Sequence, residues 1–410
     1  MTQPVHTLLR PPRRPGTGWQ AGEGASRAER LIFVEGEHDL DGDGSIRHPD
    51  RLLEQAGAAM ERVHRAVESV GGRPEDLVKL VVFHAGTTAE DEAELLRRVR
   101  THVMGTIAPV ISLVSLTRLW HDDMAVLIKA VAVDNSDGGA PRVAATPTDS
   151  PGWPSGGEFS HGIRCGEFAF VSAQSAKDAA GRMQHQDDIV AQARLTIANI
   201  ARVLEAMGCD LDDVVKLNTW YLGAGTDTDW RRAAEVRSGA FRFPGPGATG
   251  VPVPRRYPDG GQIRQECWAL RGLDGERLSR SLSWPLGHWD WPMRVSFQQG
   301  VRVGRMIFLG GQYSMDERGL AVDANDMTAQ IDHTREFIRR ILEGFGAGLE
   351  DLLEVTAFYK HAESPRGPPL ACRRLGSAAV PLTEVPLGTL GLEGVTIEVE
   401  GFAVLPDGAI

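Results

Sequence analysis

Leu211-Asp-Asp-Val-Val-Lys-Leu217 is a short polar turn followed by a β-branched apolar run, and the chain contains this pattern three times. Pro74-Glu-Asp-Leu-Val-Lys-Leu80 and Leu349-Glu-Asp-Leu-Leu-Glu-Val355 repeat it about 137 residues to either side. A second marker keeps the same spacing, and its copies are Phe33–Glu37, Phe170–Gln174 and Phe308–Gln312. Two markers in register predict three copies of one domain, and a period this long indicates that each copy has its own core.

The composition is that of a globular protein with excess negative charge. The 410 residues carry a formal net charge of −11, which argues against a broad nucleic-acid-binding surface and against binding to an anionic membrane. The four cysteines have no paired or metal-like spacing, so we expect a reduced, cytoplasmic protein. Since no stretch is apolar over the length of a signal peptide or a membrane span, we expect neither.

Each copy shows the same order of predicted elements. An apolar strand is followed by a long helical pattern, the repeated Asp-containing turn and a second strand. A second helix and a closing strand come next, although Pro365, Pro368 and Pro369 shorten that helix in the third copy. The long helices are predicted at Leu52–Val70, Ile189–Met207 and Met327–Phe345. The order β-β-α-β-α-β predicts an α+β domain with its helices on one face of a sheet.

These elements divide the chain into three domains and two linkers. The expected ranges are a disordered arm at 1–18, the first copy at 19–135, a linker at 136–157, the second copy at 158–272, a Trp-rich linker at 273–292 and the third copy at 293–410. The second linker holds Trp284, Trp289 and Trp291. We expect these side chains to cover a hydrophobic seam, because burial of each indole is worth a few kcal/mol, rather than to form a stacking platform.

The third copy carries the clearest motif. Ser296-Phe-Gln-Gln-Gly-Val-Arg-Val-Gly-Arg-Met-Ile-Phe-Leu-Gly-Gly-Gln312 resembles the opening motif of the Rid family, also called the YjgF or endoribonuclease L-PSP family. Ile397–Ala403 resembles its last strand, Phe159–Gly162 carries the likeness in the second copy, and the first copy is the most diverged. The resemblance implies chorismate-mutase-like domains, which form homotrimers with active clefts between neighbours. It therefore implies a monomeric pseudo-trimer with inward-facing sheets and outer helices, open to further self-association.

Active members of that family hydrolyse imines and enamines derived from amino acids. Their carboxylate-binding arginine aligns with Ile111, Ala248 and Leu382, so all three copies lack it. Their water-positioning glutamate aligns with Leu127, Arg264 and Glu398. Loss of a charged hydrogen bond costs roughly 1.5–3 kcal/mol, which argues against efficient hydrolysis of simple 2-imino acids. Arginines that could replace the missing one are Arg255, Arg256, Arg373 and Arg374.

Glu398 and Glu400 are separated by one residue on a predicted strand and point to the same face. Their repulsion would raise one pKa and supply a general acid or base. The alternative is a structural contact between copies, because Lys129 and Glu266 align with Glu400. Family position also suggests substrate-binding residues, which are Phe297, Gln298, Gln299, Gln312, Tyr313, Phe159, His161 and Gln174.

These residues predict a Rid-like enzyme that hydrolyses or tautomerises an imine, an enamine or a related small carbonyl metabolite in one diverged cleft, with Glu398 as the catalytic residue. The alternative is a non-catalytic small-molecule-binding or scaffold protein. The acidic charge and the lack of a histidine pair argue against a ribonuclease. We expect no cofactor and no metal, since Asp39–Asp50 fits a calcium loop only in part and favours a hairpin turn.

Overall fold

The computed structural model describes residues 20–105, 107–147, 159–291, 293–361, 370–376 and 379–406. Its strands form three six-stranded sheets with the same strand order. The first sheet consists of β1 (Gln20–Ala21), β2 (Ala25–Ala28), β3 (Leu31–Glu37), β6 (Val126–Val133), β4 (Leu77–His84) and β5 (Val110–Ser115). The second consists of β7 (Arg142–Ala145), β8 (Gly162–Cys165), β9 (Phe168–Gln174), β12 (Ile263–Leu270), β10 (Val214–Leu222) and β11 (Gly247–Val253). The third consists of β13 (Arg280–Ser283), β14 (Gly300–Val303), β15 (Met306–Leu309), β18 (Ile397–Val404), β16 (Leu352–Lys360) and β17 (Leu382–Leu387).

Neighbouring strands are antiparallel except for the outermost pair of each sheet, which is parallel. The register of that pair is the same in all three copies. Its partners include Leu80 and Ile111, Leu217 and Ala248, and Val355 and Leu382. The three positions that were aligned with the family arginine are therefore structurally equivalent.

Five helices pack on these sheets: α1 (Leu52–Ser69), α2 (Ala89–Thr101), α3 (Ile189–Ala206), α4 (Asp227–Gly239) and α5 (Met327–Glu343). The three long helices begin at the predicted residues and end one or two residues before the predicted ends. Side chains cap four of the helices at their first turn, namely Thr88, Asp188, Thr226 and Asp326. In the third copy the region of the second helix is described only as the 3₁₀ turn Leu370–Arg374, and Pro365, Pro368 and Pro369 lie outside the described residues.

The repeated aspartates have a structural role. Each lies at the end of a 3₁₀ turn, and these turns are Pro74–Asp76, Leu211–Asp213 and Leu349–Asp351. The carboxylate accepts a hydrogen bond from the backbone N–H three residues earlier, at 3.1 Å for Asp76, 2.9 Å for Asp213 and 2.8 Å for Asp351. This reciprocal cap fixes the entry into β4, β10 and β16, which explains why the pattern recurs in each copy.

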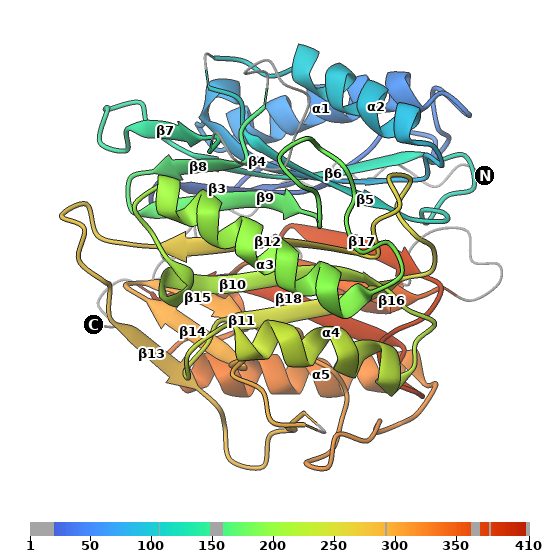
Figure 1. Cartoon of the computed structure of the whole chain (residues 1–410), viewed down its shortest axis with the longest axis vertical. Coiled ribbons are helices and arrows are strands. Elements are labelled where there is room, and N and C mark those ends of the chain that lie inside the picture. The colour runs from blue at the N-terminus through green and yellow to red at the C-terminus, as the bar shows by residue number, and fades with distance from the viewer. Residues whose placement is uncertain are drawn as a thin grey trace.

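The three sheets face one another and the helices lie outside them, with α1 and α2 at the top of Figure 1, α5 at the bottom and α3 and α4 in front. Each copy contacts both of the others. The hydrogen bonds that join them include Ala173 N–H to Ser112 Oγ (2.8 Å), Gly311 N–H to Ala248 O (2.9 Å) and Gly36 N–H to Thr383 Oγ1 (2.9 Å). The predicted α+β pseudo-trimer is confirmed.

The second sequence marker forms the core on the pseudo-threefold axis. Phe33, Phe170 and Phe308 belong to one cluster of buried residues drawn from all three copies. Trp268 lies among them, with ring centroids 5.9 Å from Phe33, 4.7 Å from Phe170 and 6.1 Å from Phe308. Edge-to-face and offset contacts at such distances stabilise a core beyond the area they bury. The repeat therefore predicts the centre of the molecule as well as its period.

Buried charges lie beside this core and join the copies in pairs. Lys129 Nζ lies 2.9 Å from Glu354 Oε1, Lys216 Nζ lies 2.8 Å from Glu400 Oε2, and Lys79 pairs with Glu266. Each pair joins two different copies, so the network closes the ring of three. The alternative of a Lys–Glu contact across copies therefore holds for Glu400 and Glu266.

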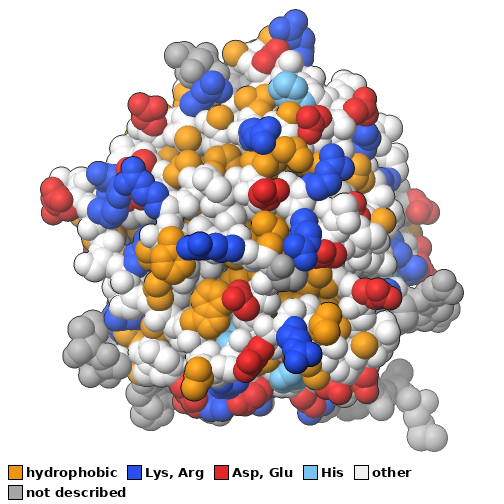
Figure 2. All heavy atoms as spheres, turned by 60° about the horizontal axis from the view of Figure 1, so that its bottom comes forward, with side chains coloured by type: hydrophobic (Ala, Val, Ile, Leu, Met, Phe, Trp, Pro, Cys, Tyr) orange, Lys and Arg blue, Asp and Glu red, His pale blue; other side chains and the backbone are white. Residues whose placement is uncertain are grey.

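The segments predicted as linkers are more ordered than expected, because each contributes an edge strand, β7 or β13, to the sheet that follows it. The predicted arm at 1–18 lies outside the described residues. No helix in the described part of the chain has the length and apolar character needed to cross a bilayer. On the face shown in Figure 2, hydrophobic side chains are interspersed with acidic and basic ones.

Candidate active site

Three clefts lie between neighbouring copies, and the last strand of each copy brings a different side chain into one of them. Arg264 of β12 lies between the first and second copies, Glu398 of β18 between the second and third, and Leu127 of β6 between the third and first. These residues are equivalent, since they pair with Trp220, Phe358 and Phe83 at matching points of β10, β16 and β4. We name the clefts after Arg264, Glu398 and Leu127.

Glu398 is a buried carboxyl group, only 1% exposed. Burial raises the pKa of Glu398 to about 8, and the charge of Glu400 adds to the rise. Hydrogen bonds from the Tyr313 hydroxyl and the Gly250 backbone N–H, together with the charge of Lys216, act in the opposite direction. Glu398 therefore keeps its proton at neutral pH, as a general acid must.

Glu400 lies two residues further along the strand and behaves in the opposite way. Although burial raises the pKa of Glu400, Lys216 and Lys129 lower it to about 2. Asn218 Nδ2 donates to Glu400 Oε2 at 2.7 Å, and Lys216 Nζ lies 2.8 Å from the same oxygen. One carboxyl of the pair is thus ionised and structural, while the other is neutral and faces the cleft.

Arg237 of α4 also reaches the Glu398 cleft, and the sequence analysis missed it. Its side chain is buried, Nη1 donates to Thr219 Oγ1 at 3.0 Å, and Nε donates to the Ala233 carbonyl at 3.3 Å. Its guanidinium carbon lies 5.5 Å from the ring centroid of Phe297. Within the described part of the chain it makes no ion pair with a carboxylate. Burial lowers the pKa of Arg237 to about 10, so it stays charged at neutral pH.

The guanidinium lies against the strand that lacks the family arginine. A Cβ at Gly250 of β11 would lie 3.1 Å from both Nη1 and Nη2 of Arg237. Gly250 is two residues beyond Ala248 and so faces the same side of the strand. A helix arginine thereby places its charge beside the vacant arginine position. The signal in the sequence was its spacing, because Arg237 continues the buried face made by Trp230, Ala233 and Ala234.

Several buried polar atoms around the Glu398 cleft have no hydrogen-bond partner among the described residues. They are Tyr221 Oη, Gln265 Oε1, His288 Nδ1, Trp289 Nε1 and Glu398 Oε2. Buried polar groups are almost always paired, so a cluster of unpaired donors and acceptors indicates a polar ligand or water. A buried arginine without a carboxylate partner indicates an anionic ligand.

The predicted binding residues of the third copy divide into two groups. Phe297 and Tyr313 line the cleft beside Arg237 and Glu398. Gln312 Nε2 instead donates to Gln299 Oε1 at 2.8 Å, and Gln299 Nε2 donates to the Trp289 carbonyl at 3.1 Å. The amide of Gln298 donates to the Ser296 carbonyl at 2.8 Å. These three glutamines therefore hold backbone and linker in place around the cleft.

The remaining predicted residues, Phe159, His161 and Gln174, belong to the opening motif of the second copy. His161 Nδ1 lies 3.2 Å from Gln174 Oε1, and burial lowers the pKa of His161 to about 4. Phe159 packs into the core of the first copy. These side chains lie on the side of the Arg264 cleft, so sequence reasoning combined residues from two separate clefts.

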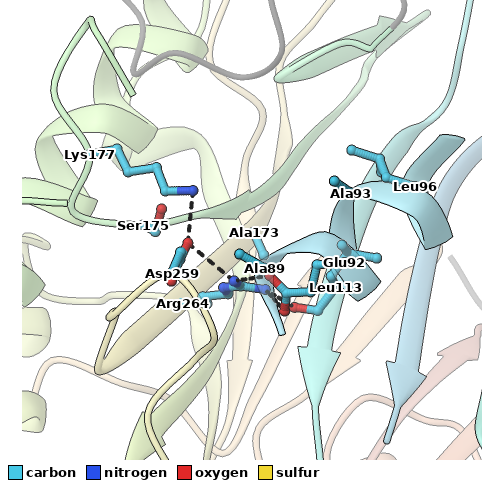
Figure 3. A pocket seen from close by; sticks show the side chains of 10 residues that line it. All are labelled: Ala89, Glu92, Ala93, Leu96, Leu113, Ala173, Ser175, Lys177, Asp259 and Arg264. Atoms are coloured by element: carbon cyan, nitrogen blue, oxygen red, sulfur yellow. Dashed lines mark hydrogen bonds and ion pairs between the residues drawn. The ribbon is translucent and has the colours of Figure 1, made fainter. Parts of the chain in front are cut away.

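The Arg264 cleft contains a cavity of about 150 Å³ whose charges are already paired (Figure 3). Arg264 binds Glu92 bidentately at 3.0 and 2.8 Å and lies 3.3 Å from Asp259, which Lys177 contacts at 2.8 Å. Although burial raises the pKa of Glu92, Arg264 and His84 lower it to about 2. No charge is left over here for a ligand.

The two clefts carry their charges in reversed positions. Counted from the N-caps Thr88 and Thr226, Glu92 occupies in α2 the position of Trp230 in α4. The Arg264 cleft thus has its acid on the helix and its base on the last strand, and the two are joined. The Glu398 cleft has its base on the helix and its acid on the last strand, and they form no ion pair.

The Leu127 cleft has no carboxyl group on its last strand. Glu35 and Glu384 lie across this interface, where Glu35 accepts a hydrogen bond from the Leu382 backbone N–H at 3.2 Å. Burial raises the pKa of Glu384 to about 7. The segment 362–369 beside this interface lies outside the described residues.

The arginines proposed from sequence as replacements lie elsewhere. Arg255 Nη2 donates to the carbonyl groups of Gly86 and Leu116, both at 2.9 Å. Arg256 pairs with Asp187 at 2.8 Å, and Arg374 pairs with Asp332 at 2.6 Å. These three contacts explain the side chains without a ligand.

Comparison with known proteins agrees with this architecture. The family model described as endoribonuclease L-PSP matches residues 22–134, 153–259 and 292–405. RutC family proteins of Pyrococcus abyssi and Pyrococcus horikoshii are 34% and 30% identical over 64 residues, which are 16% of this chain and 50% and 51% of theirs. The chain thus spans about half the length of these curated relatives. A chorismatase crystal structure superimposes with a TM-score of 0.54 and 14% identity over 80% of this chain and 93% of its own, which shows a shared fold. With three matches that cover most of its length, the chain belongs to the endoribonuclease L-PSP, or Rid, family.

Proposed function

We propose that the chain is a Rid-like enzyme that uses the Glu398 cleft to hydrolyse or tautomerise an imine, an enamine or a related small carbonyl metabolite bearing a carboxylate. One observation carries the proposal. A carboxyl group with a pKa of about 8 shares a buried cleft with Arg237, a cation that has no carboxylate partner in the described part of the chain. Neither the Arg264 cleft nor the described part of the Leu127 cleft combines these two features.

Arg237 would hold the substrate carboxylate, and the Phe297 ring beneath the guanidinium would fix its plane. Glu398 would then donate its proton to the electron-rich carbon of an enamine, while the N–H proton returns to the carboxylate. The net reaction is isomerisation to the imine. Neither an oxidant nor a cofactor is needed for this step.

Hydrolysis follows from the same two groups. Protonation of the imine nitrogen by Glu398 makes its carbon electrophilic, and the resulting carboxylate accepts a proton from the attacking water. Cleavage of the C–N bond then releases ammonia and leaves the carbonyl product, so that imine and water give carbonyl compound and ammonia. A positioned acid or base of this kind contributes about 10²- to 10⁴-fold to a rate.

The test is turnover of an amino-acid-derived imine generated in situ by the wild type and Glu398→Gln. The variant should lose about 100-fold or more in kcat, because the amide has no acidic proton to donate. Glu393→Gln is the matched control, since Glu393 is exposed in the turn before β18. Equal turnover by the wild type and Glu398→Gln would exclude the mechanism. A wild type that binds small carboxylates but turns nothing over would favour the non-catalytic binding protein.

A second candidate reaction is supported by the chorismatase likeness, which extends along most of both chains. An acid that is still protonated at neutral pH also suits protonation of an enol ether, whose carbon is electron-rich for the same reason as that of an enamine. Incubation with chorismate, with loss of substrate followed by chromatography, separates the candidates. Consumption of chorismate that requires both Glu398 and Arg237 would favour this reaction over imine hydrolysis.

A further inference from the structure

The second linker inserts two indoles into the Glu398 cleft. Trp289 is fully buried, and its ring centroid lies 4.8 Å from that of Trp291 and 5.8 Å from that of Tyr313. The Trp291 centroid lies 6.3 Å from that of Phe297. These four rings form a continuous row, which we call the aromatic wall.

The aromatic wall runs from the acid of the cleft to its cation. At one end the Tyr313 hydroxyl hydrogen-bonds to Glu398. At the other end the guanidinium of Arg237 lies over Phe297. A molecule held by Arg237 and reaching Glu398 would therefore lie along the four rings.

The linker is fastened in a way that leaves the indole of Trp289 available. Its backbone carbonyl accepts the hydrogen bond from Gln299, and the neighbouring His288 Nε2 lies 2.9 Å from Gln312 Oε1. The indole Nε1, in contrast, is buried and has no partner among the described residues. A buried N–H usually finds an acceptor, so its orphan state points to a ligand beside this ring.

We infer that the aromatic wall sets the substrate class of the Glu398 cleft, so that it takes a carboxylate bearing a flat ring or conjugated group in preference to a short aliphatic one. Trp289 is the specificity-determining residue. Stacking on indole favours flat unsaturated groups beyond the area they bury. The inference rests on the proposed function only in taking the Glu398 cleft as the substrate site.

The test uses two unreactive probes, benzoate and propionate, titrated calorimetrically into the full-length protein. The wild type should bind benzoate about tenfold more tightly or better, which corresponds to about 1.4 kcal/mol. Trp289→Phe should keep the preference, since it keeps a ring. Trp289→Leu should lower benzoate affinity to that of propionate and leave propionate unchanged.

Two variants serve as controls. Trp120→Leu removes an indole that packs on His38 in the first copy, with centroids 5.1 Å apart, and should leave both affinities unchanged. Circular dichroism establishes that each variant is folded. Arg237→Met should weaken both probes alike.

Equal affinity of the wild type for both probes, or no binding of benzoate, would overturn the inference. A folded Trp289→Leu protein that retains the preference for benzoate, or that loses both probes alike, would overturn it too. Because the titration needs no turnover, a protein with the predicted preference but without catalysis would refute the proposed function and leave the inference standing.

Discussion

At the scale of single residues, the position of Glu398 follows from the sequence but its protonation does not. Its strand register is equivalent to that of Arg264 and Leu127, as alignment predicts. Its pKa of about 8 comes mainly from burial, and the groups around it include Gly250 and Lys216 of the second copy. Only the packing of two copies creates that environment.

The first prediction concerns the pH dependence of turnover. If Glu398 acts as the acid, kcat/KM should fall as pH rises through about 8, because the carboxyl group then loses the proton it must donate. Glu400, with its pKa of about 2, stays ionised throughout and should add no limb in this range. Initial rates from pH 6 to pH 10 measure the profile (roughly two units to either side of the pKa).

Tyr313→Phe tests the origin of that limb. The Tyr313 hydroxyl lowers the pKa of Glu398, so its removal should raise the pKa and move the alkaline limb to higher pH. A limb that moves to lower pH, or one that is present in the wild type and unaffected by Glu398→Gln, would assign the titration to another group.

At the scale of elements, helix α4 and strand β11 together restore a charge that the family places on the strand. Arg237 reaches the cleft because Gly250 has no side chain in its way. Periodicity alone assigned this arginine to a helix and gave no reason to bring it to a site. The contact that matters joins two elements of the second copy, while the site it serves is completed by the third.

The second prediction is that Gly250→Ala weakens substrate binding with little change in stability. The new methyl group would lie 3.1 Å from both terminal nitrogens of Arg237, and a flexible guanidinium can shift by the few tenths of an ångström required. We expect KM to rise about tenfold, which corresponds to about 1.4 kcal/mol. Steady-state kinetics together with thermal unfolding measure the two effects.

Gly239→Ala is the control within α4, because a Cβ there meets no atom within 4 Å. Its kinetics should match those of the wild type. If Gly250→Ala also left KM unchanged, the guanidinium would have no part in binding the substrate.

At the scale of the whole molecule, the buried lysine–glutamate pairs hold different copies together. The third prediction is that Lys79→Met destabilises the protein by about 3–5 kcal/mol, because it leaves the buried charge of Glu266 without its cation. Adding Glu266→Gln should recover much of the loss. Chemical denaturation of the wild type and of the single and double variants measures the coupling, and additive effects would show that the pair contributes nothing as a pair.

The fourth prediction is that one chain is the trimer-like unit in solution. Since the three copies close a ring within one polypeptide, mass measurement should give 44.5 kDa or a small multiple of it. An assembly in which each copy pairs with its equivalents on two other chains would contradict this arrangement.

The sequence by itself determined the period, the α+β domain, the axial phenylalanines, the capping aspartates and the place of Glu398 on its strand. These features depend on local patterns, because a cap, a helix period or a strand register is encoded within a few neighbouring residues. The tertiary structure alone decided which cleft pairs an acid with an unpaired cation. Arg237, Glu398 and Trp289 are far apart in the chain, and each has an ordinary local role. Their shared function arises because packing of the second and third copies removes water from all three at once, which raises the pKa of the acid and leaves the cation without a counter-charge.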